Sequence, residues 1–168
     1  MPDRGYFGRL ADYNRWANRR LFAAAAELDD AQRRRELGLF FGSLHDVLAH
    51  LVATDNAWLA LLHGEVPQPL PDQATATFVE LARMRVALDA LIVTMVAAMT
   101  DDDFAATFQY TPWAGDFAGR VYRQPRRDVL AHLFNHHTHH RGQAHSALSL
   151  LGVAPPPLDL FVMQIGVV

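Results

Sequence analysis

Six of the nine histidines in this chain lie within a stretch of fourteen residues. They are His132, His136, His137, His139, His140 and His145. The other residues of this stretch follow a helical pattern, so we expect one long helix to carry all six. His136 and His140 are four residues apart and therefore project from the same face of that helix. Two imidazoles placed in this way can bind one transition-metal ion, so the sequence predicts a metal site inside a helical bundle.

A helical projection indicates which of these histidines face the interior. At about 100° per residue, His136 and His140 share an arc of roughly 60° with apolar side chains. Those side chains are Val129, Leu133, Ala147 and Leu151. His137, His139 and His145 lie progressively off this arc. Because an unpaired polar group in an apolar interior costs on the order of a few kcal/mol, the two inward imidazoles need partners, and a metal ion would supply one.

A second predicted helix offers a candidate third ligand. His50 projects from the apolar face of that helix, whereas His45 points about 140° away. Three neutral imidazoles from two facing helices can hold zinc, nickel, iron or manganese and leave positions open for water or substrate. His132 lies one turn before His136 and could be a fourth ligand, a partner of a ligand, or a residue on the helix surface.

Other uses of these histidines stay open on the sequence alone. A site saturated by protein ligands would bind metal without turnover, and a metal-free bundle could bond its inward imidazoles to buried carboxylates such as Asp46. The metalloprotease pattern is absent, because His137 rather than a glutamate follows His136. No serine lies in a nucleophile turn, and the glycines form no phosphate-binding loop.

Composition narrows the class of protein. The chain has 168 residues, of which 51% are hydrophobic and 20% charged, so we expect a single globular domain over residues 1–168. A net charge of −3 argues against nucleic acid as a partner. The chain has no cysteine, so a metal must be held by nitrogen and oxygen. The apolar run at 87–99 is too short for a membrane span and the start lacks a signal-peptide core, so we expect a cytoplasmic protein.

The apolar spacing predicts an all-α fold with one short β excursion. Four principal helices are expected at about 7–28, 43–63, 75–99 and 125–151. Ser43 is a plausible N-cap, and Gly64 and Gly152 are plausible C-terminal stops. Between 106 and 124 the helical period disappears, which predicts a two-stranded hairpin before the last main helix. We expect the aspartate run at 101–103 to be a solvated turn, and the tail at 158–165 to pack on the bundle.

The last main helix carries the segment NHHTHHRGQ at 135–143, which resembles the signature of the DinB/YfiT-like family of proposed metalloenzymes. The resemblance extends to YNRWAN at 13–18 and to LAHL at 48–51, followed by Asp55 and Trp58. It therefore covers nearly the whole chain. The family's fold is a four-helix bundle with a long crossover connection, and its members are often dimeric, so the resemblance implies this fold and a homodimer.

The resemblance also implies the ligands and the chemistry. The family's metal triad corresponds by motif position to His50, His136 and His140, in agreement with the projection. Related bundles include S-transferases that use bacillithiol or mycothiol and a mycothiol-dependent maleylpyruvate isomerase. The expected function is therefore a divalent-metal-dependent enzyme that transfers a low-molecular-weight thiol to small electrophiles. The alternatives are a non-catalytic metal-binding or stress-related bundle, and a metal-dependent hydrolase.

Zinc or nickel is the metal expected first, with iron or manganese as alternatives, and a thiol or water is expected as a further ligand. Tyr110, Asp46 and water held by the metal are all candidates for a general base. Arg141 projects about 100° from His140, so we expect it to anchor a neighbouring helix or loop rather than to contact a small-molecule substrate.

Overall fold

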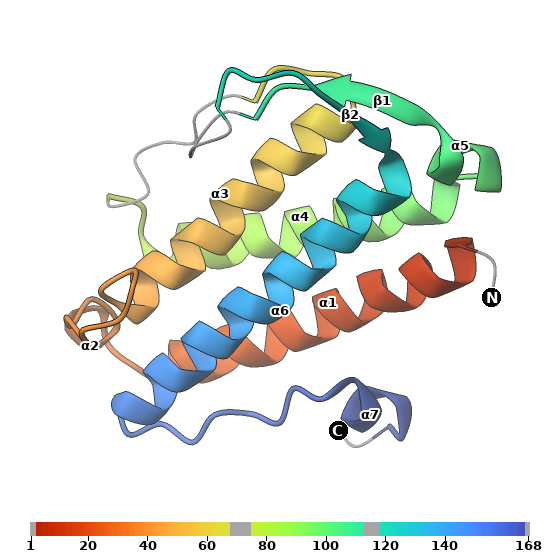
Figure 1. The fold of residues 1–168 in the computed structure, drawn as a ribbon. Coiled ribbons are helices and arrows are strands. Elements are labelled where there is room, and N and C mark those ends of the chain that lie inside the picture. The colour runs from red at the N-terminus through yellow and green to blue at the C-terminus, as the bar shows by residue number, and fades with distance from the viewer. Residues whose placement is uncertain (1–2, 68–74, 113–117, 167–168) are drawn as a thin grey trace.

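The computed structural model describes residues 3–67, 75–112 and 118–166 of the chain. Its elements in chain order are α1 (Asp3–Ala26), α2 (Asp30–Arg33), α3 (Leu44–Leu62), α4 (Phe78–Ala98), α5 (Asp101–Ala105), β1 (Thr107–Tyr110), β2 (Tyr122–Pro125), α6 (Arg126–Leu150) and α7 (Leu160–Gln164). Figure 1 shows the four long helices α1, α3, α4 and α6 side by side, with the hairpin at the end of the bundle where α6 begins.

The four long helices form a closed ring of contacts. Helices α1 and α3 each pack against both α4 and α6, so α1 lies diagonally opposite α3 and α4 lies diagonally opposite α6. The connections from α1 to α3 and from α4 to α6 therefore cross the bundle, and the second of them contains α5 and the antiparallel pair β1–β2. The predicted all-α bundle with a crossover and a short hairpin is confirmed.

Local capping explains where several helices begin and end. Ser43 caps α3 by accepting a hydrogen bond from the backbone N–H of Asp46, and Thr77 caps α4 in a capping box with Glu80. Gly64 follows α3 with a φ of 77°, a conformation that favours glycine and ends the helix. These residues satisfy backbone groups that an uncapped helix end would leave without partners.

Two of the predicted boundaries are wrong. The aspartate run is not a turn but the short helix α5, because Thr100 and Asp103 form a capping box and the acidic side chains favour a helix N-terminus. Helix α1 begins at Asp3, four residues earlier than the apolar spacing indicates. Helix α6 begins at Arg126, directly after its N-cap residue Pro125, in agreement with the predicted start at about 125.

Aromatic and aliphatic side chains fill the space between the helices. The ring of Phe7 stacks against Phe104 at 5.4 Å and against Phe134 at 6.3 Å, which joins α1 to α5 and α6. The tail packs on the bundle, where the Tyr13 hydroxyl donates a hydrogen bond of 2.6 Å to the carbonyl of Leu158. Within the three described ranges, none of the helices is both long and apolar enough to cross a bilayer.

Candidate metal centre

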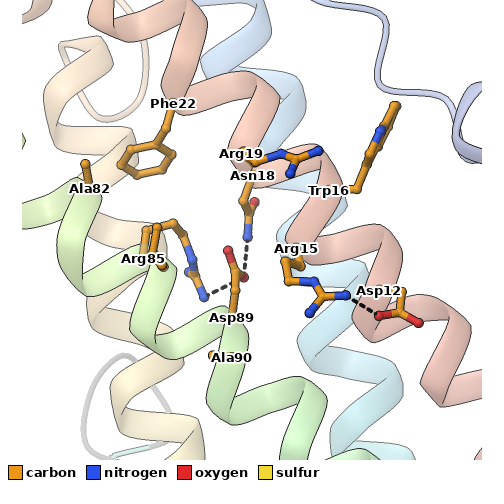
Figure 2. A pocket seen from close by; sticks show the side chains of 11 residues that line it. Asp12, Arg15, Trp16, Asn18, Arg19, Phe22, Ala82, Arg85, Asp89 and Ala90 are labelled. Carbon is orange, nitrogen blue, oxygen red and sulfur yellow. Dashed lines mark hydrogen bonds and ion pairs between the residues drawn. The ribbon is translucent and has the colours of Figure 1, made fainter. Parts of the chain in front are cut away.

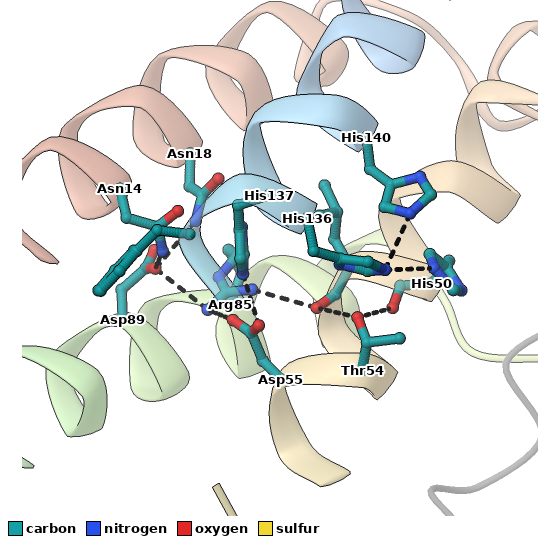
Figure 3. A network of polar contacts seen from close by, with 12 residues as sticks. Asn14, Asn18, His50, Thr54, Asp55, Arg85, Asp89, His136, His137 and His140 are labelled. Carbon is teal, nitrogen blue, oxygen red and sulfur yellow. Dashed lines mark hydrogen bonds and ion pairs between the residues drawn. The ribbon is translucent and has the colours of Figure 1, made fainter. Parts of the chain in front are cut away.

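The three predicted ligands meet between α3 and α6. The Nε2 atom of His136 lies 2.9 Å from Nε2 of His140 and 3.4 Å from Nε2 of His50. One ligand atom from each histidine lies within 4.8 Å of both others. Figure 3 shows His136 and His140 projecting from α6 toward His50 on α3. The two helices pack directly against each other, so residues far apart in the sequence share one site.

Gln143 fixes the ring of His140. Its Oε1 atom lies 2.7 Å from Nδ1 of His140. An amide oxygen only accepts hydrogen bonds, so Nδ1 carries the proton and Nε2 presents a lone pair toward the other two histidines. This is the arrangement found around metal-binding imidazoles, whose second nitrogen donates to an oxygen that orients the ring.

Burial keeps these imidazoles neutral. Burial, followed by the nearby His140, lowers the pKa of His50 to about 4 and that of His136 to about 3. Burial also lowers the pKa of His140 below its ordinary value. Neutral imidazole is the form that binds a metal ion, so the cluster is ready to bind at neutral pH without losing protons to solvent.

Aromatic rings flank the three histidines. The ring of Phe41 lies 4.4 Å from that of His50 and 5.4 Å from that of His140. Towards the hairpin, the ring of His132 lies 5.8 Å from that of His136 and 5.2 Å from Trp58. The cluster therefore has the apolar ring of Phe41 on one side, which lowers the local dielectric there, and the imidazole of His132 next to His136 on the other.

The donor set fits a divalent transition metal. Two imidazole nitrogens bound to one ion at about 2.0–2.1 Å are separated by about 2.9 to 3.4 Å for the usual bond angles, which is the separation of the two closest nitrogen pairs. Without an ion, the single proton that His136 Nε2 can carry makes at most one well-aligned bond to its two neighbours. The residues His50, His136 and His140 could therefore hold a metal ion.

Among the described residues the cluster has three donors. His132 is not a member of the group of close ligand atoms, and its side chain is exposed. Asp46 accepts a hydrogen bond from the hydroxyl of Ser43 at 2.5 Å, and Tyr110 accepts one from Gln124 at 2.9 Å. Neither candidate base has a hydrogen bond or ring contact with the three histidines in the described parts of the chain.

His137 has a role that the projection did not indicate. It lies off the arc of His136 and His140, yet its side chain is fully buried. Its Nε2 atom lies 2.5 Å from Oδ1 of Asp55 on α3. Burial lowers the pKa of His137 to about 4 despite this carboxylate, so the neutral ring donates to an ionised Asp55. His137 is buried although it lies off that arc, because α6 packs against both α1 and α3 and more than one of its faces is therefore buried.

Asp55 leads into a buried polar network that sequence reasoning missed. Its Oδ2 atom lies 2.5 Å from Nη2 of Arg85, and the same Nη2 lies 3.1 Å from Oδ1 of Asp89. Although burial favours the protonated acid, His137 and Arg85 lower the pKa of Asp55 to about 2. The available signal was Arg85 and Asp89, which are four residues apart on α4 and enclose the apolar residues 86–88, because buried charges must be paired.

Arg141 anchors α6 to α1, as its projection predicted. Its guanidinium donates hydrogen bonds to the side-chain oxygens of Asn14 and Asn18, and it stacks over the ring of Tyr13 at 5.0 Å. Arg141 is only 3% exposed. It therefore contributes to the packing of the bundle and does not face the histidine cluster.

Comparisons with known proteins show the family of the chain. The sequence model of the DinB family matches residues 1–165. The chain is also 24% identical over 159 residues to the protein DinB of Bacillus subtilis (strain 168), an alignment that covers 90% of this chain and 89% of that protein. The family match spans all four long helices and therefore every residue of the histidine cluster. The chain belongs to the DinB family.

Proposed function

We propose that this chain is a metal-dependent enzyme that binds a divalent transition metal, zinc or nickel first, through His50, His136 and His140. The observation that carries the proposal is the convergence of three neutral imidazole nitrogens, with no fourth histidine, aspartate or glutamate in the same group among the described residues. Three protein ligands are typical of catalytic rather than structural sites, because positions are left for water or substrate. The same proposal includes a small-molecule substrate, a homodimer and a cytoplasmic location.

We further propose that a low-molecular-weight thiol is the species activated, and that the reaction is its transfer to a small electrophile. A bound divalent cation lowers the pKa of a coordinating thiol and so provides a nucleophile at neutral pH. Gln143 holds His140 in the required tautomer. Phe41 supplies apolar surface against His50 and His140, which suits a small organic electrophile.

Cobalt substitution tests both parts of the proposal. We expect Co²⁺ to give the visible absorption of a site with nitrogen ligands, and bacillithiol, mycothiol or glutathione to add a sulfur-to-cobalt charge-transfer band. His136→Ala should abolish both signals. His63→Ala is the matched control, because His63 is exposed at the end of α3 and outside the cluster.

The outcomes separate the alternatives. A cobalt spectrum that no thiol alters, together with no thiol-dependent turnover of electrophiles, would contradict the transferase part and leave a metal site of another kind. A non-catalytic, saturated site requires a fourth protein ligand, for which His132 is the nearest histidine on α6. Metal affinity that falls strongly in His132→Ala would favour that version, whereas unchanged affinity supports the open site.

A further inference from the structure

Helix α6 carries two interleaved pairs of polar side chains. His136 and His140 belong to the histidine cluster. His137 and Arg141 each follow one of them directly in the sequence and are also four residues apart. The second pair therefore projects about 100° around the helix from the first. Both members of the second pair are buried, at 0% and 3% exposure, and both belong to the polar network.

The network joins all four long helices at the level of the histidine cluster. From α6, His137 contacts Asp55 of α3, and Asp55 contacts Arg85 of α4. Asp89, one turn further along α4, accepts hydrogen bonds from Asn14 at 3.2 Å and from Asn18 at 2.9 Å. Figure 2 shows Asn18 and Arg85 directed at Asp89 between α1 and α4.

Arg141 links α6 directly to α1, so that the network forms a closed ring. Its guanidinium donates hydrogen bonds to the same two asparagines of α1, Asn14 and Asn18. With His137 neutral, the network contains two cations, Arg85 and Arg141, and two anions, Asp55 and Asp89. Balanced buried charges of this kind contribute little net stability compared with an apolar core, because desolvation offsets their attraction. The hydrogen bonds and ion pairs of the network are directional, however, and they allow only one relative orientation of the helices.

We propose that this network positions the metal ligands. It fixes the rotation of α6 about its own axis and thereby directs the side chains of His136 and His140 toward His50. Asp55, His137 and Arg141 are its principal positioning residues. The inference rests on the proposed metal site, because it concerns the alignment of that site's ligands.

The accuracy that metal–ligand distances require explains why the rotation of α6 must be fixed. An imidazole nitrogen lies well outside the Cα radius of about 2.3 Å, so a helix rotation of about 10° moves it by about 1 Å. Metal–ligand distances tolerate only about ±0.2 Å. The hydrophobic effect is non-directional, whereas the hydrogen bonds of His137 and Arg141 hold α6 from two neighbouring helices.

Arg141→Met tests the inference, because it keeps an unbranched buried side chain and removes every bond of the guanidinium. We expect the dissociation constant for Co²⁺ to rise by about threefold to tenfold, less than the tenfold or more that removal of a ligand's own hydrogen-bond partner typically costs. The cobalt absorption spectrum should also change in position or intensity. Asn18→Ala, on a different helix and without contact to the ligands, should shift both quantities in the same direction by a smaller factor.

Val129→Ala is the control for general destabilisation. Val129 is fully buried on α6 but outside the network, so its truncation should lower the melting temperature and leave cobalt affinity within about twofold of wild type. Unchanged affinity and spectrum in folded Arg141→Met would overturn the inference, and Asn18→Ala decides if Arg141→Met does not fold. A wild-type protein that binds no cobalt would instead refute the proposed metal site itself.

Discussion

Nε2 of His137 lies 2.5 Å from Oδ1 of Asp55, and neither side chain is more than 1% exposed. His137 directly follows His136, and Asp55 lies five residues after His50. The contact therefore ties α6 to α3 beside the point where the histidine cluster forms. The two adjacent histidines therefore have different partners: His136 belongs to the cluster, and His137 bonds to the buried carboxylate of Asp55.

Asp55→Ala should be strongly destabilising. The substitution leaves Arg85 buried with one carboxylate fewer and His137 without its acceptor, and breaking a buried pair in this way typically costs about 3–5 kcal/mol. Urea unfolding of the metal-free protein measures the loss. The control is Asp12→Ala, which removes an exposed pair with Arg15 and should cost less than about 1 kcal/mol. Equal losses in the two variants would contradict a special role for Asp55.

The metal-free protein should lose stability as the pH falls from 6.5 towards 4. The pKa values of His50 and His137 are lowered from 6.5 to about 4 in the folded chain, and that of His136 to about 3. In this window the unfolded chain binds more protons, so acid favours unfolding. Melting temperatures measured in chelator at pH 7 and pH 5 test this. A melting temperature that is constant or rises at pH 5 would show that these imidazoles are not held neutral.

Gln143→Leu should weaken metal binding without a comparable loss of stability. The variant removes the acceptor of the His140 Nδ1–H, so the ring is no longer held in one tautomer, and affinity should fall about tenfold or more. Isothermal titration with Zn²⁺ gives the dissociation constant. Ser146→Ala is the control, since Ser146 is exposed on the same helix and bonds only to the carbonyl of Gly142 among the described contacts. Equal Zn²⁺ affinity in both variants would show that Gln143 does not contribute to metal binding.

Thr77→Ala should lower the free energy of unfolding by about 1 kcal/mol, because it removes the side-chain cap of α4. Metal affinity should stay unchanged, since this end of α4 carries no residue of the cluster or the network. Thermal unfolding and zinc titration of the same sample check both statements. A large loss of affinity would show that stability of α4 alone controls the metal site.

The sequence predicts the residues of the cluster because the face of a helix on which each histidine lies is a local property, although their meeting depends on the packing of α3 against α6. The four-residue spacing of His136 and His140 defines a shared face, and the projection of His50 selects it over His45. The partners of His137 could not be predicted in the same way, because contacts between Asp55, Arg85 and α6 depend on how distant helices pack. A projection onto one apolar arc also assumes a single buried face, which is wrong for a helix that contacts two neighbours.

The most direct measurement is the metal content of the chain, purified without a histidine tag or added metal, by elemental mass spectrometry. We expect about one zinc, nickel, iron or manganese ion per chain in wild type and in His63→Ala. We expect almost none in His50→Ala or His136→Ala. Absence of metal from wild type, even after reconstitution, or full retention of metal by both cluster variants, would refute the metal site at His50, His136 and His140.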